Sequence, residues 1–208
     1  MSKRLITEDF VLKKIKNGEK EILISKDEII TPLALDRIKS AGLKIISEIV
    51  SLHSTENIFK KIIIGSDHTG VKAKKVLVDF LKQKNYDVLD IGTFTEESVD
   101  YPDIAFNVAN RVKLGEFDCG IILDATGIPS SITANKIPGI RAATCYNEFS
   151  AKSSREHNDA NILVMGAKAL GDETIKSITN VWLNSKFLGD RHQRRLDKIK
   201  AIEEKFKH

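Results

Sequence analysis

The sequence predicts an α/β fold: a five-stranded parallel sheet with helices on both faces, Rossmann-like or flavodoxin-like, preceded by a small α+β N-terminal module. From residue 60 onward, short apolar runs alternate with segments of helical periodicity, the pattern of repeated βα units. Before residue 60 the expected elements are shorter, and the polar stretch 50–57 reads as a linker. We therefore expect an N-terminal module over 1–58 and a main domain over 59–208.

The main domain is expected to alternate strands and helices from beginning to end. Strands are predicted where short apolar runs occur, at 62–66, 88–91, 120–124, 141–145 and 162–165. Helices are predicted where apolar residues recur every three or four positions or charged residues dominate, at 71–84, 104–114, from 130 onward, 148–156, 173–183 and 191–205.

The N-terminal module is expected to contain two helices and two strands. A helix is predicted over 7–16 with Thr7 as its N-cap, and another over 32–41 with Pro32 in its first turn. The strands are expected at 21–25 and 43–49, and no internal repeat is apparent. So small a unit favours a structural or oligomerisation role over catalysis.

Composition excludes several classes of protein. The 41% hydrophobic and 30% charged residues indicate a globular protein, and a net charge of +4 gives no indication of nucleic-acid binding. No apolar run reaches the roughly 18–20 residues of a membrane span, and the N-terminus lacks the apolar core of a secretory signal, so we expect a cytoplasmic location. Cys119 and Cys145 form no disulfide framework, and the histidines lack metal-ligand spacing, so no metal or cofactor is expected.

The strongest candidate site lies within residues 121–136, IILDATGIPSSITANK. Asp124 ends a predicted strand, and Thr126, Gly127 and Ser130 follow it with hydroxyl and N–H groups just before a helix. Ligands bind at the carboxyl ends of parallel strands, and helix N-termini attract anions. Plain capping is the alternative, because Asp and Ser are common turn and cap residues.

A second candidate follows the first strand, in the segment GSDHTG. Asp67 and His68 could move protons or bind hydroxyl groups there, although Asp67 could equally cap the next helix. In the segment SVDYP, Tyr101 could lie over a ligand.

Cationic side chains offer a third candidate. Arg191 and Arg195 are four residues apart on one face of the last predicted helix, and two guanidinium groups suit a phosphate. Arg155 is a further cation in SREHNDAN. The alternative for so charged a helix is a solvated surface.

Five segments, in order over residues 60–200, resemble the ribose-5-phosphate isomerase B family, which includes the galactose-6-phosphate isomerase subunits. They are GSDHTG, DIGTFTEESVDYPD, TGI…ANKIPGIRAA, AKSSREHNDANIL and DRHQRRLDKI. The resemblance implies metal-free aldose–ketose isomerisation of a phosphorylated sugar through a cis-enediolate. It also implies a homodimer or dimer of dimers, with active sites between subunits.

The resemblance also implies roles for individual residues. Asp67 would assist ring opening, and Thr126, the N–H groups of the Gly127 loop and Asn135 would stabilise the enediolate. His68, Arg191 and Arg195 would bind the phosphate, with both arginines reaching across the dimer and Arg155 as a weaker addition.

The sequence departs from the family pattern at the reacting position. The family's usual base is a Cys, in a CGTGIG pattern, where this chain has Asp124; a Glu that some relatives use corresponds to Ser130. A His common in the family is replaced by Tyr146, and Pro129 replaces a loop Gly. Three hypotheses remain: Asp124 is an alternative base, the chain is a subunit that supplies its arginines to a Cys-bearing paralogue, or it binds sugar phosphate without turnover.

The N-terminal module resembles short segments at the start of some ethanolamine-utilisation and related microcompartment proteins, mainly in ITPLALDRIKSAGLKI. This resemblance implies assembly with a shell or encapsulation in a bacterial microcompartment. A plain dimer-extending appendage is the alternative.

Overall fold

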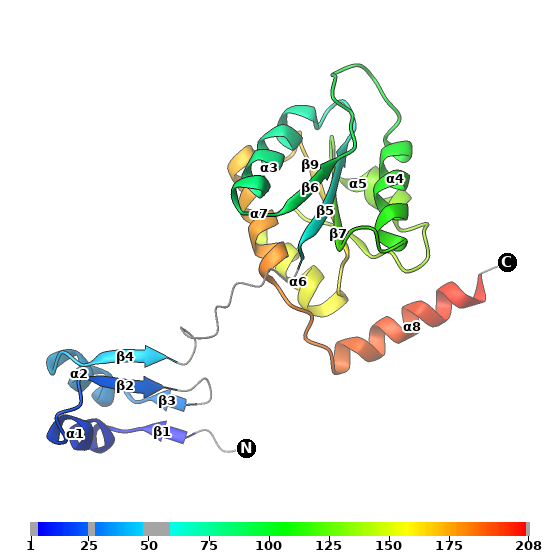
Figure 1. Ribbon diagram of the computed structural model, residues 1–208. Coiled ribbons are helices and arrows are strands. Elements are labelled where there is room, and N and C mark those ends of the chain that lie inside the picture. Colours follow the sequence, from blue (N-terminus) through cyan, green and yellow to red (C-terminus); the bar gives the residue numbers. More distant parts are fainter. Residues whose placement is uncertain (1–3, 25–27, 48–58, 207–208) are drawn as a thin grey trace. The chain divides into compact units, whose positions relative to one another are not determined.

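The computed structural model describes residues 4–24, 28–47 and 59–206, which form two compact units (Figure 1). The first unit comprises the described residues up to 47, and the second comprises 59–206. The predicted linker at 50–57 and the predicted boundary at residue 58 lie outside the described residues.

The N-terminal unit consists of two β-α-β halves. The first half contains β1 (Arg4–Ile6), α1 (Glu8–Lys16) and β2 (Glu21–Ile24). The second contains β3 (Glu28–Ile30), α2 (Pro32–Ser40) and β4 (Lys44–Ser47). The predicted helices and the strands β2 and β4 are confirmed, whereas the three-residue strands β1 and β3 were not predicted.

The two halves pair strand by strand, which corrects the expectation of no internal repeat. β1 runs parallel to β3, and β2 runs parallel to β4, so each half supplies one strand to each pair. A Thr precedes each helix, at Thr7 and Thr31, and a glycine with positive φ follows each helix, at Gly18 and Gly42. Only Thr31 accepts a capping bond, from the Ala34 N–H at 3.3 Å.

This unit has an apolar core of its own. The buried side chains of the core are Ile6, Val11, Ile22, Ile24, Ala34 and Ile38. They come from both halves, so the duplication closes one core between the strands and the two helices.

The second unit confirms the predicted α/β fold. Its strands are β5 (Lys61–Ser66), β6 (Asp87–Asp90), β7 (Cys119–Asp124), β8 (Ala142–Thr144) and β9 (Ile162–Gly166). Its helices are α3 (Val71–Gln83), α4 (Tyr101–Lys113), α5 (Ile128–Ala134), α6 (Glu148–Asn158), α7 (Asp172–Asn184) and α8 (Arg191–Lys205). All neighbouring strands are parallel, in the order β6-β5-β7-β9-β8.

Helices cover both faces of this sheet. Neighbouring residues of a strand point to opposite faces, and on β5 they pack against different helices. On β5, Ile62 and Ile64 pack into the cluster formed with α3, α6 and α7, while Ile63 packs into the cluster with α4 and α5. The strands are therefore apolar on both sides, as buried parallel strands are.

The strand order places a topological switch between β5 and β7. The chain leaves β5 for β6 on one side and then crosses back to β7 on the other. In open parallel sheets, ligands bind in the crevice at the carboxyl ends of such a pair of strands. β8 lies outside β9 at the sheet edge, so the last two strands exchange the places they have in the flavodoxin order.

Candidate functional site

Asp67 comes directly after β5, and Asp124 is the last residue of the neighbouring strand β7, so both lie at the switch point. Ser66 of β5 is in register with Leu123 of β7, so the next residue of each strand is one of the two aspartates. The Asp67 N–H donates to the Leu123 carbonyl at 3.1 Å, which joins the two strand ends directly. The sheet thus brings together two carboxylates that the sequence places 57 residues apart (124 − 67).

The Asp67 carboxylate is held at the start of the β5–α3 turn. It is 7% exposed and its Oδ1 accepts from the Thr69 N–H at 2.9 Å and from the Thr69 hydroxyl at 2.6 Å. Both bonds are to one residue of the turn, which orients the side chain without using its second oxygen. The structure does not give Asp67 the predicted capping role, because the N-cap of α3 is Gly70 and this helix has no side-chain capping bond.

The Asp124 carboxylate is hydrogen-bonded to the backbone of the β7–α5 turn. It is 1% exposed and accepts three backbone N–H bonds. Oδ1 accepts from Thr126 at 2.8 Å and from Gly127, and Oδ2 accepts from Ser130 at 3.1 Å. The N–H groups predicted to stabilise an enediolate therefore point at this carboxylate in the structure.

Two glycines let the turn pack against the end of β9. Gly127 has φ +83°, and a Cβ there would lie 2.9 Å from the Thr144 Cγ2 and 3.1 Å from the Met165 carbonyl carbon. A Cβ on Gly166 would lie 2.6 Å from the Thr126 carbonyl oxygen. Larger residues at either position would push the turn away from the sheet.

Side chains of neighbouring elements also hold the turn. The Thr144 hydroxyl donates to the Gly127 carbonyl at 3.0 Å, and the Tyr146 hydroxyl donates to the Thr126 carbonyl at 2.8 Å. Tyr146 is 41% exposed, so its ring lies at the surface beside the turn. The structure gives its hydroxyl a hydrogen bond to the backbone next to the reacting position.

Ser130 lies on α5, and Asn135 is the residue directly after the last residue of this helix. The Asn135 amide donates to the Ser131 and Ala142 carbonyls at 2.9 and 2.8 Å and accepts from the Ala142 N–H at 2.9 Å. These bonds join α5 to β8, so the amide is engaged with backbone at that junction. The Ser130 hydroxyl is buried with no hydrogen-bond partner among the described residues.

His68, which follows Asp67 in the chain, lines an open cavity of about 220 Å³; neither Asp67 nor Asp124 is among its lining residues. The other lining residues are Thr69, Lys72, Glu96 and Lys168. Lys72 and Glu96 form an exposed ion pair at 2.8 Å; this contact raises the pKa of Lys72 and lowers that of Glu96. Tyr101, predicted in a loop, is the first residue of α4 and is 37% exposed.

The sequence analysis missed Lys168. It follows β9, and its N–H donates to the Ala125 carbonyl at 3.0 Å, so its backbone is tied to the β7 turn. A signal was present in the sequence, since a basic residue comes two positions after the glycine that directly follows the predicted strand 162–165. The segment after that strand lies outside the five segments that resemble the family.

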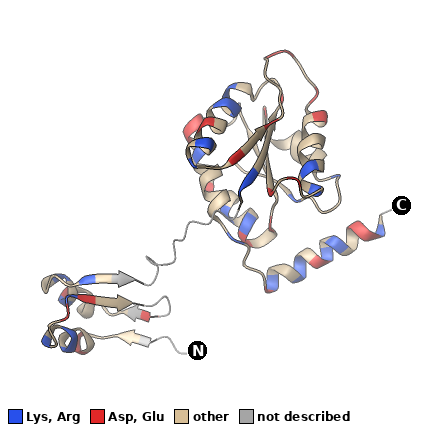
Figure 2. Ribbon diagram, in the orientation of Figure 1, with Lys and Arg blue, Asp and Glu red and all other residues tan. Residues whose placement is uncertain are grey.

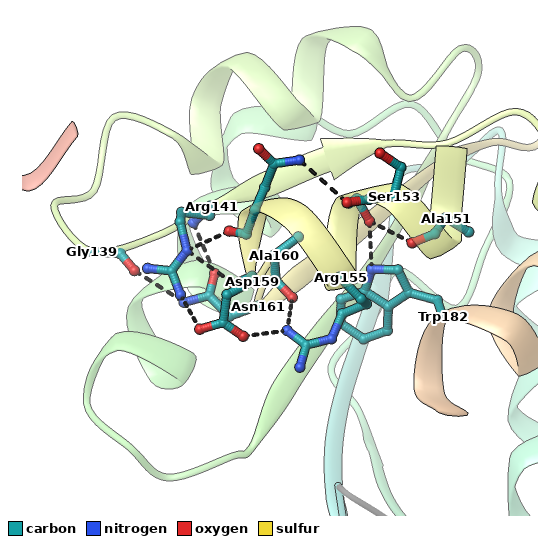
Figure 3. Close-up of polar contacts among 11 residues, drawn as sticks. Gly139, Arg141, Ala151, Ser153, Arg155, Asp159, Ala160, Asn161 and Trp182 are labelled. Atoms are coloured by element: carbon teal, nitrogen blue, oxygen red, sulfur yellow. Dashed lines mark hydrogen bonds and ion pairs between the residues drawn. The ribbon is translucent and has the colours of Figure 1, made fainter. Parts of the chain in front are cut away.

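Arg155 is buried and bonded within its own chain. It is 5% exposed, and its Nη1 donates to Asp159 at 2.8 Å and to the Ala160 carbonyl at 2.6 Å (Figure 3). Its guanidinium carbon lies 4.8 Å from the ring centroid of Phe59 and 5.4 Å from that of Trp182. Arg155 therefore has packing and hydrogen-bond partners within its own chain, and its contact with phosphate stays a prediction.

Arg191 and Arg195 lie at the other end of the sheet from the aspartates. They occupy the first turns of α8, where His192 stacks on His157 with 4.4 Å between ring centroids. His157 is in the last turn of α6, which begins beyond the carboxyl end of β8 and ends before the start of β9. The structure therefore does not bring the two arginines to Asp67, His68 and Asp124 of the same chain.

α8 is the last helix of the unit (Figure 1) and carries basic and acidic residues along its length (Figure 2). Besides the histidine stack, Glu203 accepts from the Gly139 N–H at 3.0 Å. Both predicted arginines are exposed.

Neither cysteine is suited to replace the missing thiol base. Cys119 and Cys145 are buried and unpaired, and burial raises the pKa of each thiol above its usual value. Among the described residues, no three His, Cys, Asp or Glu side chains gather as metal ligands would. No helix in the described part of the chain is long and apolar enough to cross a membrane.

Comparison with known proteins decides the family. The Ribose/Galactose Isomerase family model matches residues 62–199, more than half of the chain. The chain belongs to this family. The predicted resemblance is confirmed for the second unit.

Individual relatives agree. Ribose-5-phosphate isomerase B of Escherichia coli is 44% identical over 146 residues, which cover 70% of this chain and 98% of that protein. D-erythrulose-4-phosphate isomerase of Pectobacterium atrosepticum is 38% identical over 148 residues, covering 71% and 97%. The solved structure of ribose-5-phosphate isomerase B from Clostridium thermocellum is 51% identical with a TM-score of 0.70, covering 71% of this chain and 99% of that one.

Proposed function

We propose that this chain is an aldose–ketose isomerase of a phosphorylated pentose or hexose, working through a cis-enediolate with Asp124 in place of the usual Cys base. One observation carries the proposal: Asp67 follows β5 and Asp124 ends the adjacent, in-register β7 at the switch point, and the next residue after Asp67, His68, lines a cavity with Lys168. Acid–base groups alone can run this reaction, so the proposal includes no metal and no cofactor.

The proposed mechanism divides the work between the two carboxylates. Asp67, whose Oδ2 accepts no bond from the turn, assists proton transfer during ring opening. Asp124 then removes the proton beside the carbonyl and returns it to the neighbouring carbon. Its Oδ2 accepts only one N–H bond, whereas Oδ1 accepts two, so Oδ2 is the better placed oxygen.

The phosphate would be bound by groups from two copies of the chain. His68 and Lys168 line the cavity of one copy. Arg191 and Arg195 lie at the opposite end of their own sheet, so they can complete this site only in a second copy. A homodimer, or a dimer of dimers, is therefore part of the proposal.

A second function is favoured by one observation. Asp124 is 1% exposed and its oxygens already accept three N–H bonds, which is what a purely structural carboxylate would do. In that case the chain would be a binding or partner-dependent subunit, supplying its arginines to a paralogue that carries the base.

The test is an assay of the pure protein against aldose and ketose 4-, 5- and 6-phosphates, with wild type and Asp124→Asn. We expect the variant to lose about 10²–10⁴-fold in kcat, the usual worth of a general base. Asp79→Asn is the matched control, because Asp79 is an exposed aspartate on α3. Full activity of Asp124→Asn would contradict the assignment of the base.

Asp124→Cys separates the two functions. This variant installs the residue type of the family pattern and frees the turn N–H groups. If wild type is inactive and Asp124→Cys gains turnover, the second function is supported. Loss of sugar-phosphate binding in Arg191→Ala, with no turnover on any sugar, would support it as well.

For the N-terminal unit we propose a role in assembly, including encapsulation in a bacterial microcompartment. In support, the family match begins at residue 62, and this unit has its own core. Co-purification with shell proteins, lost when residues 1–58 are deleted, would be the expected result. A deletion that left both shell association and oligomeric state unchanged would contradict this role.

A further inference from the structure

A buried lysine lies next to the candidate site but lines no part of its cavity. Lys74, in the second turn of α3, is 1% exposed. Its ammonium donates to Asp90 Oδ1 and lies 4.5 Å from the ring centroid of Phe94. Lysines are almost never fully buried unless they are paired, so this pair calls for an explanation.

Asp90 ends β6 and starts the loop that leads to α4. The Gly92 N–H also donates to Asp90 Oδ1, at 3.1 Å. The loop is then joined to the end of β5 by two short bonds: the Ser66 N–H donates to the Gly92 carbonyl, and the Thr93 N–H donates to the Ser66 carbonyl, both at 2.7 Å. Ser66 immediately precedes Asp67.

The same loop reaches His68 further along. The Val99 N–H donates to His68 Nδ1 at 3.4 Å, and Glu96 pairs with Lys72 at 2.8 Å. A histidine that accepts at Nδ1 carries its proton on Nε2 when it is neutral. His68 is thereby set to donate from Nε2 to an anion.

We propose that Lys74 is a positioning residue for this site. Through Asp90 it fixes the loop over residues 90–99, and through the Val99 N–H it fixes the orientation and tautomer of His68. It thereby sets the affinity of the site for the anionic group of its ligand. The identification of that group as a sugar phosphate rests on the proposed function.

The test compares Lys74→Met with Lys75→Met, the exposed neighbour on the same helix. Lys74→Met is expected to raise KM for the sugar phosphate about ten- to a hundredfold, the effect of losing one well-placed charge-assisted hydrogen bond, with kcat nearly unchanged. The ¹⁵N signals of the His68 ring should also move towards a mixture of tautomers. Lys75→Met should change neither.

A double variant guards against simple misfolding. Lys74→Met with Asp90→Asn removes both charges and keeps an oxygen for the Gly92 N–H. If Lys74 positions the loop, this variant folds but still binds poorly; recovery of wild-type KM would show that only charge balance matters and would overturn the proposal. A folded Lys74→Met protein with wild-type KM and unchanged His68 signals would also overturn it.

The inference and the proposed function can fail separately. If wild type turns over no sugar phosphate, the proposed function fails. The His68 ring signals and the binding of inorganic phosphate then still decide the role of Lys74, because neither requires turnover.

Discussion

The Asp124 carboxylate can accept about four hydrogen bonds, and three backbone N–H groups already use it. A thiolate at the same position would present one sulfur atom close to the backbone in place of two oxygens further out, so it could not receive these three donors in the same geometry. The replacement of Cys by Asp therefore affects both the proposed base and the hydrogen bonding of the turn amides. This coupling is why Asp124→Asn and Asp124→Cys have to be measured together.

Arg155 offers a residue-scale prediction about stability. Arg155→Met removes its bond to Asp159, but Arg141 still pairs with that carboxylate at 2.8 Å. We expect the free energy of unfolding to fall by about 2 kcal/mol, which is less than the usual cost of leaving a buried charge without its partner. Activity per folded molecule should not change. Denaturant unfolding followed by the fluorescence of Trp182, the one tryptophan of the chain, measures this directly.

Arg191→Met is the matched control. Because Arg191 is exposed, we expect its replacement to alter stability by less than about 0.5 kcal/mol while weakening phosphate binding. The opposite pattern, a raised KM with normal stability in Arg155→Met, would show that Arg155 takes part in substrate binding.

At the scale of elements, the sequence predicted most of the second unit because each strand is a short apolar run followed by a periodic helix. It did not reveal β1 and β3, since three residues are too few to show a period. It placed Asp124 at a strand end but could not count its donors, because their convergence depends on the positive φ of Gly127. It also could not show that Arg191 lies at the far end of the sheet, which depends on how α6 and α8 pack.

The junction of α6 and α8 should respond to pH. His192 is 5% exposed, stacks on His157 and accepts from Arg191 Nε at 3.3 Å. Burial, then the charges of His157, Arg191 and Arg195, lower the pKa of His192 below 6.5, with Asp190 opposing them. The unfolded state then binds the proton first, so the stabilisation of α8 is complete above pH 6.5 and is lost as pH falls through the lower folded pKa.

Hydrogen exchange across α8 measures this effect. Protection factors over residues 191–205 should fall as pH decreases from about 7.5 to about 5.5. His192→Phe, which keeps a stacked ring without a titrating group, should remove most of the pH dependence. Equal pH dependence in the variant would assign the effect to His157 or to another group.

At the scale of the whole molecule, the two units divide the chain into separate cores. The buried clusters of the sheet contain only residues from Phe59 onward, and the core of the N-terminal unit contains only residues up to Ile38. The relatives match about 70% of this chain and nearly all of their own length. The match to the family begins at residue 62, so it falls within the second unit.

This division predicts that the chemistry survives loss of the N-terminal unit. Val11 is fully buried in that unit, so Val11→Asp in the full chain should unfold it by placing a charge in its core. We expect kcat and KM to stay within about twofold of wild type, because no group of the candidate site depends on that core. The chain from residue 59 onward should behave in the same way, and its oligomeric state, measured by light scattering, should differ only if the N-terminal unit contributes to assembly. A loss of turnover in both variants, with the second unit still folded, would mean that the N-terminal unit completes the active site.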